Sequence, residues 1–195
     1  MRRFPLLLPW LLLQCLGAAL LLPGGCAPKA IDMMQPPPAT LRGQAWVVDV
    51  QLSLGGPSRA SVAAADAKLR ERRPAAAGPA SDDTALPFAQ MFVKMVKDVA
   101  RERGLASGRA VTVSIEMDQA QVQGTGMAAL GRGDRLAGQV RVLDARSGDK
   151  LAEFYVDVDK IRPGLIGLAI RGTGVREKLA GEFARRIADQ LTAPR

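Results

Sequence analysis

The side chains that could carry out acid–base chemistry in this chain are carboxylates, because its 195 residues include no histidine. Histidine is the usual general base and the commonest metal ligand, so Ser-His-Asp, Cys-His and HExxH sites are all excluded. Two carboxylate pairs, Glu116 with Asp118 and Glu153 with Asp157, each lie on one face of a strand-like segment. Glycosidase-like hydrolysis needs two carboxyl groups about 5–10 Å apart in a cleft. Such pairs are more often solvated, so catalysis is the alternative hypothesis.

Two groups of residues could contact anions, and for both a solvated loop is the favoured interpretation. Glycines in 124–126 and 131–135 could cradle an anion with their backbone N–H groups. No Gly-Lys-Ser/Thr follows them, and the segment leads into a strand rather than a helix. Arg70, Arg72 and Arg73 could touch anionic headgroups or glycan, but a charge run usually forms a solvated face.

Four aspartates could supply oxygen ligands for calcium: Asp144, Asp149, Asp157 and Asp159. Their spacing matches no EF-hand loop, and aspartates that alternate along a strand usually face solvent. We therefore predict no metal and no cofactor.

The N-terminus has the three-part order of a secretory signal. Residues 1–3 supply positive charge, residues 6–22 are almost wholly apolar, and Pro23-Gly24-Gly25 breaks that run just before Cys26. An apolar segment that enters the bilayer, followed by an extended stretch for a peptidase, is the physical basis of export. We predict that residues 1–25 are a signal peptide.

An uncleaved membrane anchor is the competing interpretation of the same segment. Residues 4–22 approach the roughly 20 residues that span a bilayer. Pro5, Pro9 and Gln14 interrupt the stretch, which favours cleavage. In either case the arginine pair stays on the cytoplasmic side and the rest of the chain is carried outside.

The segment Leu22-Pro23-Gly24-Gly25-Cys26 resembles the lipobox of bacterial lipoproteins, whose peptidase takes small residues directly before a cysteine. The resemblance implies that Cys26 becomes the lipid-attached first residue of the mature chain. Pro23 departs from the family, which usually has leucine there. In lipoproteins of this kind, aspartate after the cysteine favours inner-membrane retention. Ala27 stands there instead, so the resemblance favours the outer membrane over the inner membrane, facing the periplasm.

Other cleavage sites fit the sequence less well. Cys15 follows Gln14, which is too large and polar for the position before the cysteine. Cleavage after Ala27 would place Pro28 next, which the general signal peptidase cuts poorly. With Cys15 removed and Cys26 acylated, the mature chain would keep no free thiol and no disulfide.

Composition limits the partners of the mature chain. The full sequence is 48% hydrophobic and 24% charged with a net charge of +8, which fits a globular domain. We interpret the surplus of arginine mainly as a means of keeping a secreted domain soluble, with anionic headgroups or envelope polymers as the alternative. Export makes nucleic acid an improbable partner, and aromatic residues, which stack on bases, form only 4% of the chain. We expect a membrane reached through the lipid anchor and an envelope protein as partners; the sequence does not fix the oligomeric state.

Hydropathy patterns divide the remainder into a tether and one domain. Residues 26–44 are predicted to be a lipidated, Pro-rich tether, because Pro36-Pro37-Pro38 favours polyproline II. Residues 45–195 are predicted to form a single α/β domain. Period-two alternation indicates strands at 45–54, 109–117, 135–145 and 150–158. Apolar stripes indicate helices at 86–103 and 175–191, and an Ala-rich stretch indicates a shorter, exposed helix or loop at 61–73.

The predicted order, β-α-β-β-β-α, favours an α+β fold. We expect a two-layer sandwich in which a mostly antiparallel sheet of about four strands packs on two main helices. This architecture resembles small periplasmic accessory lipoproteins, among them the amino-terminal domain of the Tol-system periplasmic protein and the lipoprotein activators of penicillin-binding proteins. The hairpin Val142–Leu151 also resembles a Val-x-Asp-Ala-x-x-Gly-x-x-Leu pattern in uncharacterised lipoproteins. Fold analogy alone does not assign a function.

The leading functional hypothesis is a non-catalytic, lipid-anchored envelope module that binds or positions a partner. The alternatives are an enzyme that acts on envelope glycan or lipid through paired carboxylates, and a passive structural spacer. Residues 164–170 are apolar and glycine-punctuated, which fits either a docking loop or a buried lead-in to the last helix.

Overall fold

The structure is a computed structural model that describes residues 31–72, 86–121, 134–160 and 175–192. The strands are β1 (Ile31–Gln35), β2 (Ala45–Leu54), β3 (Arg109–Gln121), β4 (Asp134–Asp144) and β5 (Lys150–Lys160). The helices are α1 (Gly56–Arg72), α2 (Phe88–Glu102) and α5 (Val175–Leu191).

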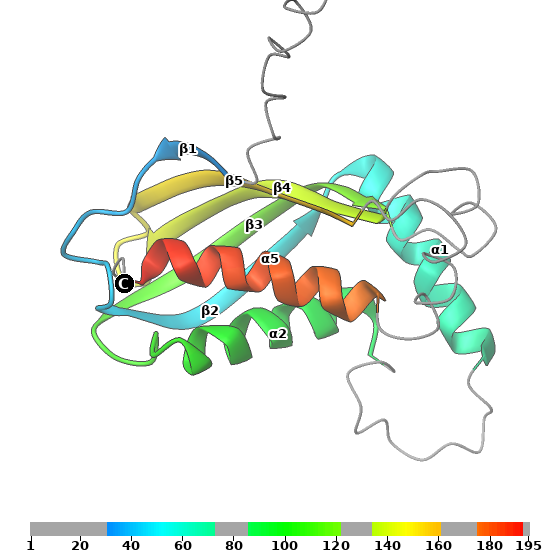
Figure 1. Cartoon of the computed structure of the whole chain (residues 1–195), viewed down its shortest axis with the longest axis horizontal. Helices are drawn as coiled ribbons and strands as arrows, with labels where there is room; N and C mark the ends of the chain where they lie inside the picture. The colour runs from blue at the N-terminus through cyan, green and yellow to red at the C-terminus, as the bar shows by residue number, and fades with distance from the viewer. Residues whose placement is uncertain (1–30, 73–85, 122–133, 161–174, 193–195) are drawn as a thin grey trace, which may run out of the picture.

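The five strands form one sheet in the order β1-β5-β4-β3-β2 (Figure 1). β3, β4 and β5 pair antiparallel in chain order. β2 and β3 are the one parallel pair, and the chain between them passes through α1 and α2. A parallel pair requires such a crossover, because the chain must return to the starting end of the sheet.

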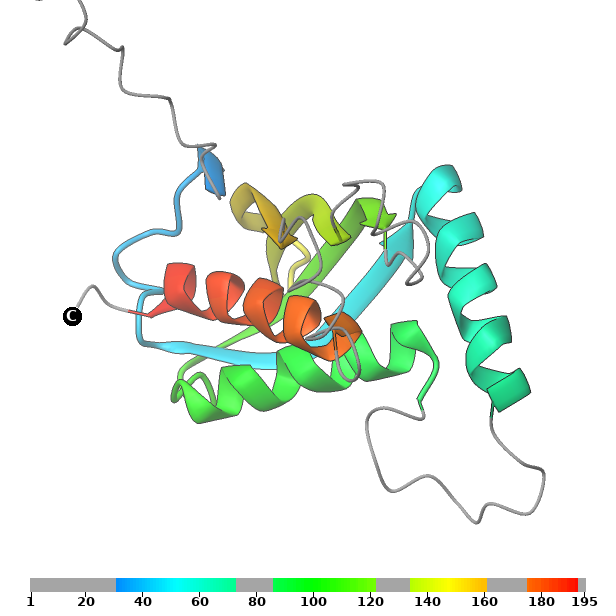
Figure 2. The same ribbon diagram turned by 45° about the vertical axis from the view of Figure 1, so that its right-hand side comes forward.

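Helices α2 and α5 lie side by side on one face of the sheet, while α1 lies at one end of it (Figures 1 and 2). Apolar residues every three or four positions give α2 and α5 one buried stripe each. The ring centroids of Phe92 and Phe183 lie 5.4 Å apart in a T-shaped contact between the two helices. Phe88 and Phe154 are also fully enclosed, so aromatic rings fill the centre of the core.

The predicted α+β class and the mostly antiparallel two-layer arrangement are confirmed, with five strands rather than four. The additional strand, β1, lies inside the segment predicted to be a tether and pairs antiparallel with β5. Residues 36–44 also pack on the domain: Leu41 is 1% exposed, and the Gly43 N–H donates to the Leu191 carbonyl at 2.8 Å. Residues 31–44, predicted to belong to the tether, are therefore part of the folded unit.

Several predicted features fall outside the described residues. They are the signal peptide 1–25, Cys26, the glycines of 124–126 and 131–133, and the apolar segment 164–170. None of the helices in the described ranges combines the length and apolar character that crossing a bilayer requires.

Candidate interaction surface

The face of the sheet opposite α2 and α5 carries polar side chains, and no described helix covers it (Figure 1). The strands alternate, so each buried residue has neighbours that point to this face. On β5, for example, Phe154 and Val156 are fully buried, whereas Glu153 and Tyr155 are only partly covered. We call this the helix-free face, and it is formed by β1 to β5.

Arg141 on β4 joins the two neighbouring strands across this face. Its Nε donates to Glu153 Oε1 on β5 at 3.0 Å, and its Nη2 lies 3.6 Å from Glu116 Oε2 on β3. Gln139 Nε2 also donates to Glu153 Oε1, at 2.8 Å, and Lys150 Nζ contacts Glu153 Oε2. Cross-strand pairs of this kind hold long side chains flat against the sheet. The Lys150 and Arg141 donors lower the pKa of Glu153 below its ordinary value.

A second charged group lies toward the other end of β4 and β5. Arg135 Nε donates to Asp157 Oδ1 at 2.8 Å, and its Nη2 contacts Oδ2, so the guanidinium binds the carboxylate through two nitrogens. The Asp157 hydrogen bond raises the pKa of Arg135. Burial raises the pKa of Tyr155 nearby, and the negative charges of Asp118 and Asp157 raise it further. The Tyr155 hydroxyl therefore stays protonated at neutral pH.

Among the residues that the structure describes, carboxylates outnumber basic groups on the helix-free face, although the chain as a whole carries +8. Strand register and contacts place the following carboxylates there: Asp32, Asp49, Glu116, Asp118, Glu153, Asp157 and Asp159. Among the described residues, the basic side chains on or bordering it are Arg135, Arg141 and Lys150, together with Lys97 of α2, whose Nζ reaches Asp49. In the described part of this basic chain, one face of the sheet therefore carries an excess of carboxylates.

The structure places the predicted carboxylate pairs on this face, where three of the four residues lie against an arginine. Glu153 binds Arg141 and Asp157 binds Arg135. For Glu153, the Lys150 and Arg141 donors lower the pKa and so favour the ionised form over a proton-donating one. Glu116 is half-exposed beside Arg141. Two described hollows, at α2 and near Trp46, include none of the four residues.

The four aspartates considered for calcium do not converge. Asp144 and Asp149 lie at the β4–β5 turn, whereas Asp157 and Asp159 lie toward the far end of β5. In the part of the chain that the structure describes, no group of three or more potential ligands could hold a metal ion.

Asp144 organises the β4–β5 turn. Its Oδ1 accepts hydrogen bonds from the backbone N–H groups of Arg146 and Ser147, at 2.8 and 2.9 Å, and its Oδ2 accepts one from Arg109 Nε at 2.7 Å. The Ser147 N–H, Arg109 and the Arg146 N–H, in that order, hold the pKa of Asp144 far below its ordinary value. Gly148 follows with φ +77°, a conformation that glycine adopts most easily.

Trp46 lies 47% exposed beside this turn. With Gly108, Arg109, Ala110, Asp144 and Arg146 it lines a hollow of about 290 Å³. Arg109 forms an ion pair with Asp144, so we interpret this hollow as a feature of the β4–β5 turn rather than as a ligand site.

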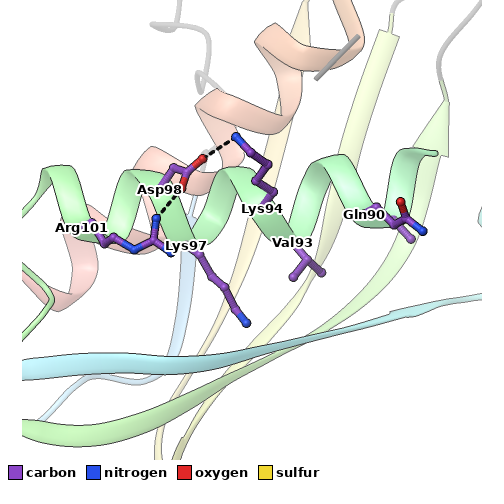
Figure 3. A pocket seen from close by; sticks show the side chains of 7 residues that line it. Gln90, Val93, Lys94, Lys97, Asp98 and Arg101 are labelled. Carbon is purple, nitrogen blue, oxygen red and sulfur yellow. Dashed lines mark hydrogen bonds and ion pairs between the residues drawn. The ribbon is translucent and has the colours of Figure 1, made fainter. Parts of the chain in front are cut away.

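A larger, shallow hollow of about 550 Å³ runs along the outer side of α2, and every residue that lines it belongs to that helix (Figure 3). Within this hollow, Asp98 forms ion pairs with Lys94 Nζ at 2.8 Å and with Arg101 Nη1 at 2.7 Å. Lys97 points away from that pair, and its Nζ lies 3.5 Å from Asp49 Oδ1 on β2. These ion pairs describe a solvated helix surface rather than a ligand site.

The arginines predicted to touch anions are divided by the structure. Arg70 and Arg72 lie in the last turn of α1, and Arg73 lies outside the described residues.

The sequence did not reveal that Arg135 and Arg141 of β4 pair with Asp157 and Glu153 of β5, because these contacts follow from strand register. It also missed Asp66, which is 8% exposed and accepts hydrogen bonds from the Phe88 N–H at 3.0 and 3.2 Å.

No protein-family model matches the chain, and no curated protein matches it. Solved structures with some likeness include the PelC dodecamer of Paraburkholderia phytofirmans, at 9% identity and a TM-score of 0.48, covering 85% of this chain and 98% of that one. A Xanthomonas campestris protein of the family model DUF330 has 11% identity and a TM-score of 0.46, with coverages of 80% and 89%. A Caulobacter crescentus CB15 protein, whose name marks it as an inferred lipoprotein, has 17% identity and a TM-score of 0.36, with coverages of 67% and 94%. At these values the likenesses carry no conclusion about this chain's function, assembly or membrane attachment.

Proposed function

We propose that this protein is a non-catalytic module, held at the periplasmic side of the cell envelope by acyl chains on Cys26, that binds a basic surface of an envelope protein through its helix-free face. The outer membrane is the favoured membrane, because Ala27 rather than aspartate follows Cys26.

The acidity of the helix-free face is the observation that carries the proposal. The full sequence has a net charge of +8, whereas the described residues of this sheet face carry more carboxylates than basic groups, so the sign of the charge is reversed locally. Complementary charge steers a partner to one surface and fixes its orientation. The internal ion pairs of Arg141 and Arg135 preorganise this layer, so few side chains need to be ordered on binding.

Anchoring at Cys26 supports the same function in a different way. Acyl chains confine the domain to one membrane surface, which raises its effective concentration toward partners in that membrane. A modest protein–protein affinity then suffices. The sequence of charge, apolar run, small residues and cysteine carries this part of the proposal.

Site-specific photocross-linking in intact cells tests the binding surface. A benzophenone amino acid replaces Gln51, which is exposed on β2 of the helix-free face, or Gln90, which is exposed on α2. We expect one discrete adduct from position 51 and none from position 90. The partner peptide in that adduct should be rich in lysine and arginine. No adduct at position 51, or the same adduct from both positions, would contradict the proposed surface.

Charge neutralisation separates electrostatic recognition from mere proximity. The double variant Glu116→Gln/Asp159→Asn removes two exposed carboxylates of the helix-free face. We expect it to lower the yield from position 51 by about fivefold, and added salt to lower the wild-type yield as well. The matched control Glu71→Gln/Glu102→Gln removes two exposed carboxylates from α1 and α2, and it should leave the yield unchanged.

A further inference from the structure

The edge strand β1 carries two exposed apolar side chains. Among the described residues, the exposed large hydrophobic side chains are Met33 at 38%, Met34 at 57% and Trp46 at 47%. Met33 lies opposite Phe154 and so shares the helix-covered face. Met34 Sδ lies 3.6 Å from Gln139 Nε2 on the helix-free face. The two thioethers therefore flank the outer edge of the sheet from both sides.

The covalent chain places this edge close to Cys26. Ile31, the first residue of β1, is five positions after Cys26, and five extended residues span at most about 17 Å, whatever path they take. If Cys26 is acylated, as the proposed function holds, the strand cannot leave the neighbourhood of the membrane surface.

We infer that the β1 edge lies against the lipid bilayer, with Met33 and Met34 in its interfacial region. This inference rests on the proposed function, because Cys26 supplies the anchor. Apolar side chains gain free energy by entering the boundary between headgroups and acyl chains. Headgroups and water there can also pair with backbone groups on the outer side of β1, which borders no other described strand.

A bilayer fits this edge better than a second copy of the chain. β1 has only five residues, and its register with β5 shifts between Met33 and Gln35. Short, bulged edge strands are poor templates for pairing with another strand. Methionine side chains, by contrast, adapt to irregular surroundings such as a lipid interface.

The placement fixes the orientation of the domain. β1 is one edge of the sheet, and α2 lies near the opposite edge, beside β2 (Figure 1). With β1 against the bilayer, the sheet stands up from the membrane and α2 is remote from it. The helix-free face then looks sideways, along the membrane, where a neighbouring membrane-bound protein can reach it.

Lipid quenching of a site-specific fluorophore tests this orientation on the full acylated protein. Acylation of Cys26 leaves the mature chain without another thiol, so Met34→Cys, Met33→Cys or Gln90→Cys introduces a single labelling site. The labelled proteins are reconstituted in vesicles of phosphatidylethanolamine and phosphatidylglycerol that contain nitroxide-bearing acyl chains. We expect quenching at positions 33 and 34 to exceed that at position 90 by about threefold or more.

The outcomes separate this inference from the proposed function. Equal quenching at positions 34 and 90 in a protein that floats with the vesicles overturns the β1 placement and leaves the anchor intact. A protein whose mass shows no acyl group overturns both. The same label is also followed in detergent at rising protein concentration without vesicles. A concentration-dependent emission shift there would assign the β1 edge to a second copy and overturn the bilayer placement.

Discussion

At the scale of single residues, Asp66 connects the three described helices. Its carboxylate on α1 accepts the Phe88 N–H at the start of α2, and Arg176 Nη1 of α5 lies 3.4 Å from Oδ1. The side chains of Asp66 and Arg176 are 12% and 11% exposed. A carboxylate at a helix N-terminus satisfies a backbone donor and interacts favourably with the helix dipole. Asp66 therefore replaces the capping side chain that Pro87 cannot supply.

We predict that Asp66→Ala lowers the free energy of unfolding by about 2 kcal/mol, because it removes a charged acceptor from a nearly buried N–H and from Arg176. Asp66→Asn keeps an acceptor oxygen and should cost about half as much. Urea unfolding measures both. The exposed Glu71→Gln on the same helix is the control, and a loss of similar size there would refute this role.

Asp144 gives the protein a predictable response to acid. Its pKa is lowered in the folded state, so its contribution to stability is complete above the unfolded pKa of about 4 and is lost as the pH falls below that value. We predict that Asp144→Asn flattens the decline in urea midpoint between pH 5 and pH 3. The variant should be less stable than the wild type at pH 7, and the gap should narrow in acid. Parallel curves for both proteins would be evidence against this linkage.

At the scale of elements, two glycines at close packing contacts have opposite tolerance for a side chain. A Cβ on Gly138 of β4 would lie 2.5 Å from the Glu116 carbonyl oxygen and 2.9 Å from Met117 Cα, both backbone atoms of β3. A Cβ on Gly181 of α5 would meet the Met95 Sδ of α2 at 3.3 Å, at the end of a flexible side chain. The backbone atoms beside Gly138 cannot shift unless β3 moves, whereas the Met95 side chain beside Gly181 can rotate away.

We therefore predict that Gly138→Ala destabilises the protein by about 2–3 kcal/mol, through forced separation of β3 and β4. Gly181→Ala should change stability by less than about 1 kcal/mol, because alanine's better helix propensity offsets the small displacement of Met95. Thermal or urea unfolding of the two variants side by side checks the contrast. A larger loss for Gly181→Ala would contradict it.

Elements with a strong local pattern could be predicted from the sequence. The helix predicted at 175–191 has those bounds in the structure, and the four alternating strands are present within a few residues. α1 begins at Gly56 rather than at 61, because Pro57 suits a first helical turn and Ser58 Oγ donates to the Asp118 carbonyl at 2.6 Å. Its Val62 and Asp66 are buried, so it is not the fully exposed helix that its composition suggested.

The β1 strand and the pairings on the helix-free face could not be predicted in the same way. Ile31-Asp32-Met33-Met34-Gln35 has two adjacent apolar residues and precedes a proline run, so no local alternation marks a strand. Its pairing with β5 joins residues more than a hundred positions apart. The Arg141–Glu153 contact likewise depends on which residues the β4–β5 register brings opposite each other. The β4–β5 turn could be predicted from the sequence, because its signal, Arg146-Ser147-Gly148-Asp149, is local. In the structure, Asp144 accepts the Arg146 N–H and Gly148 has φ +77°.

At the scale of the whole molecule, the proposals describe a domain that is fixed to a membrane at one edge and recognised on one face. In these proposals the carboxylates of the sheet, two of which bind arginine, serve in recognition. By the same proposals, the anchor confines the domain to the membrane, and the β1 edge sets its orientation there. The acidic helix-free face then binds the partner. All three depend on what happens at Cys26.

The measurement that tests this account most directly is the intact mass of the mature protein purified from its native membranes. The account predicts a chain of residues 26–195 whose mass exceeds that of the polypeptide by the acyl groups on Cys26. Substituting Cys26→Ala should abolish the added mass and release the protein from the membrane fraction. A chain that retains Met1, or one that starts near residue 26 without acyl groups, would contradict the central claim.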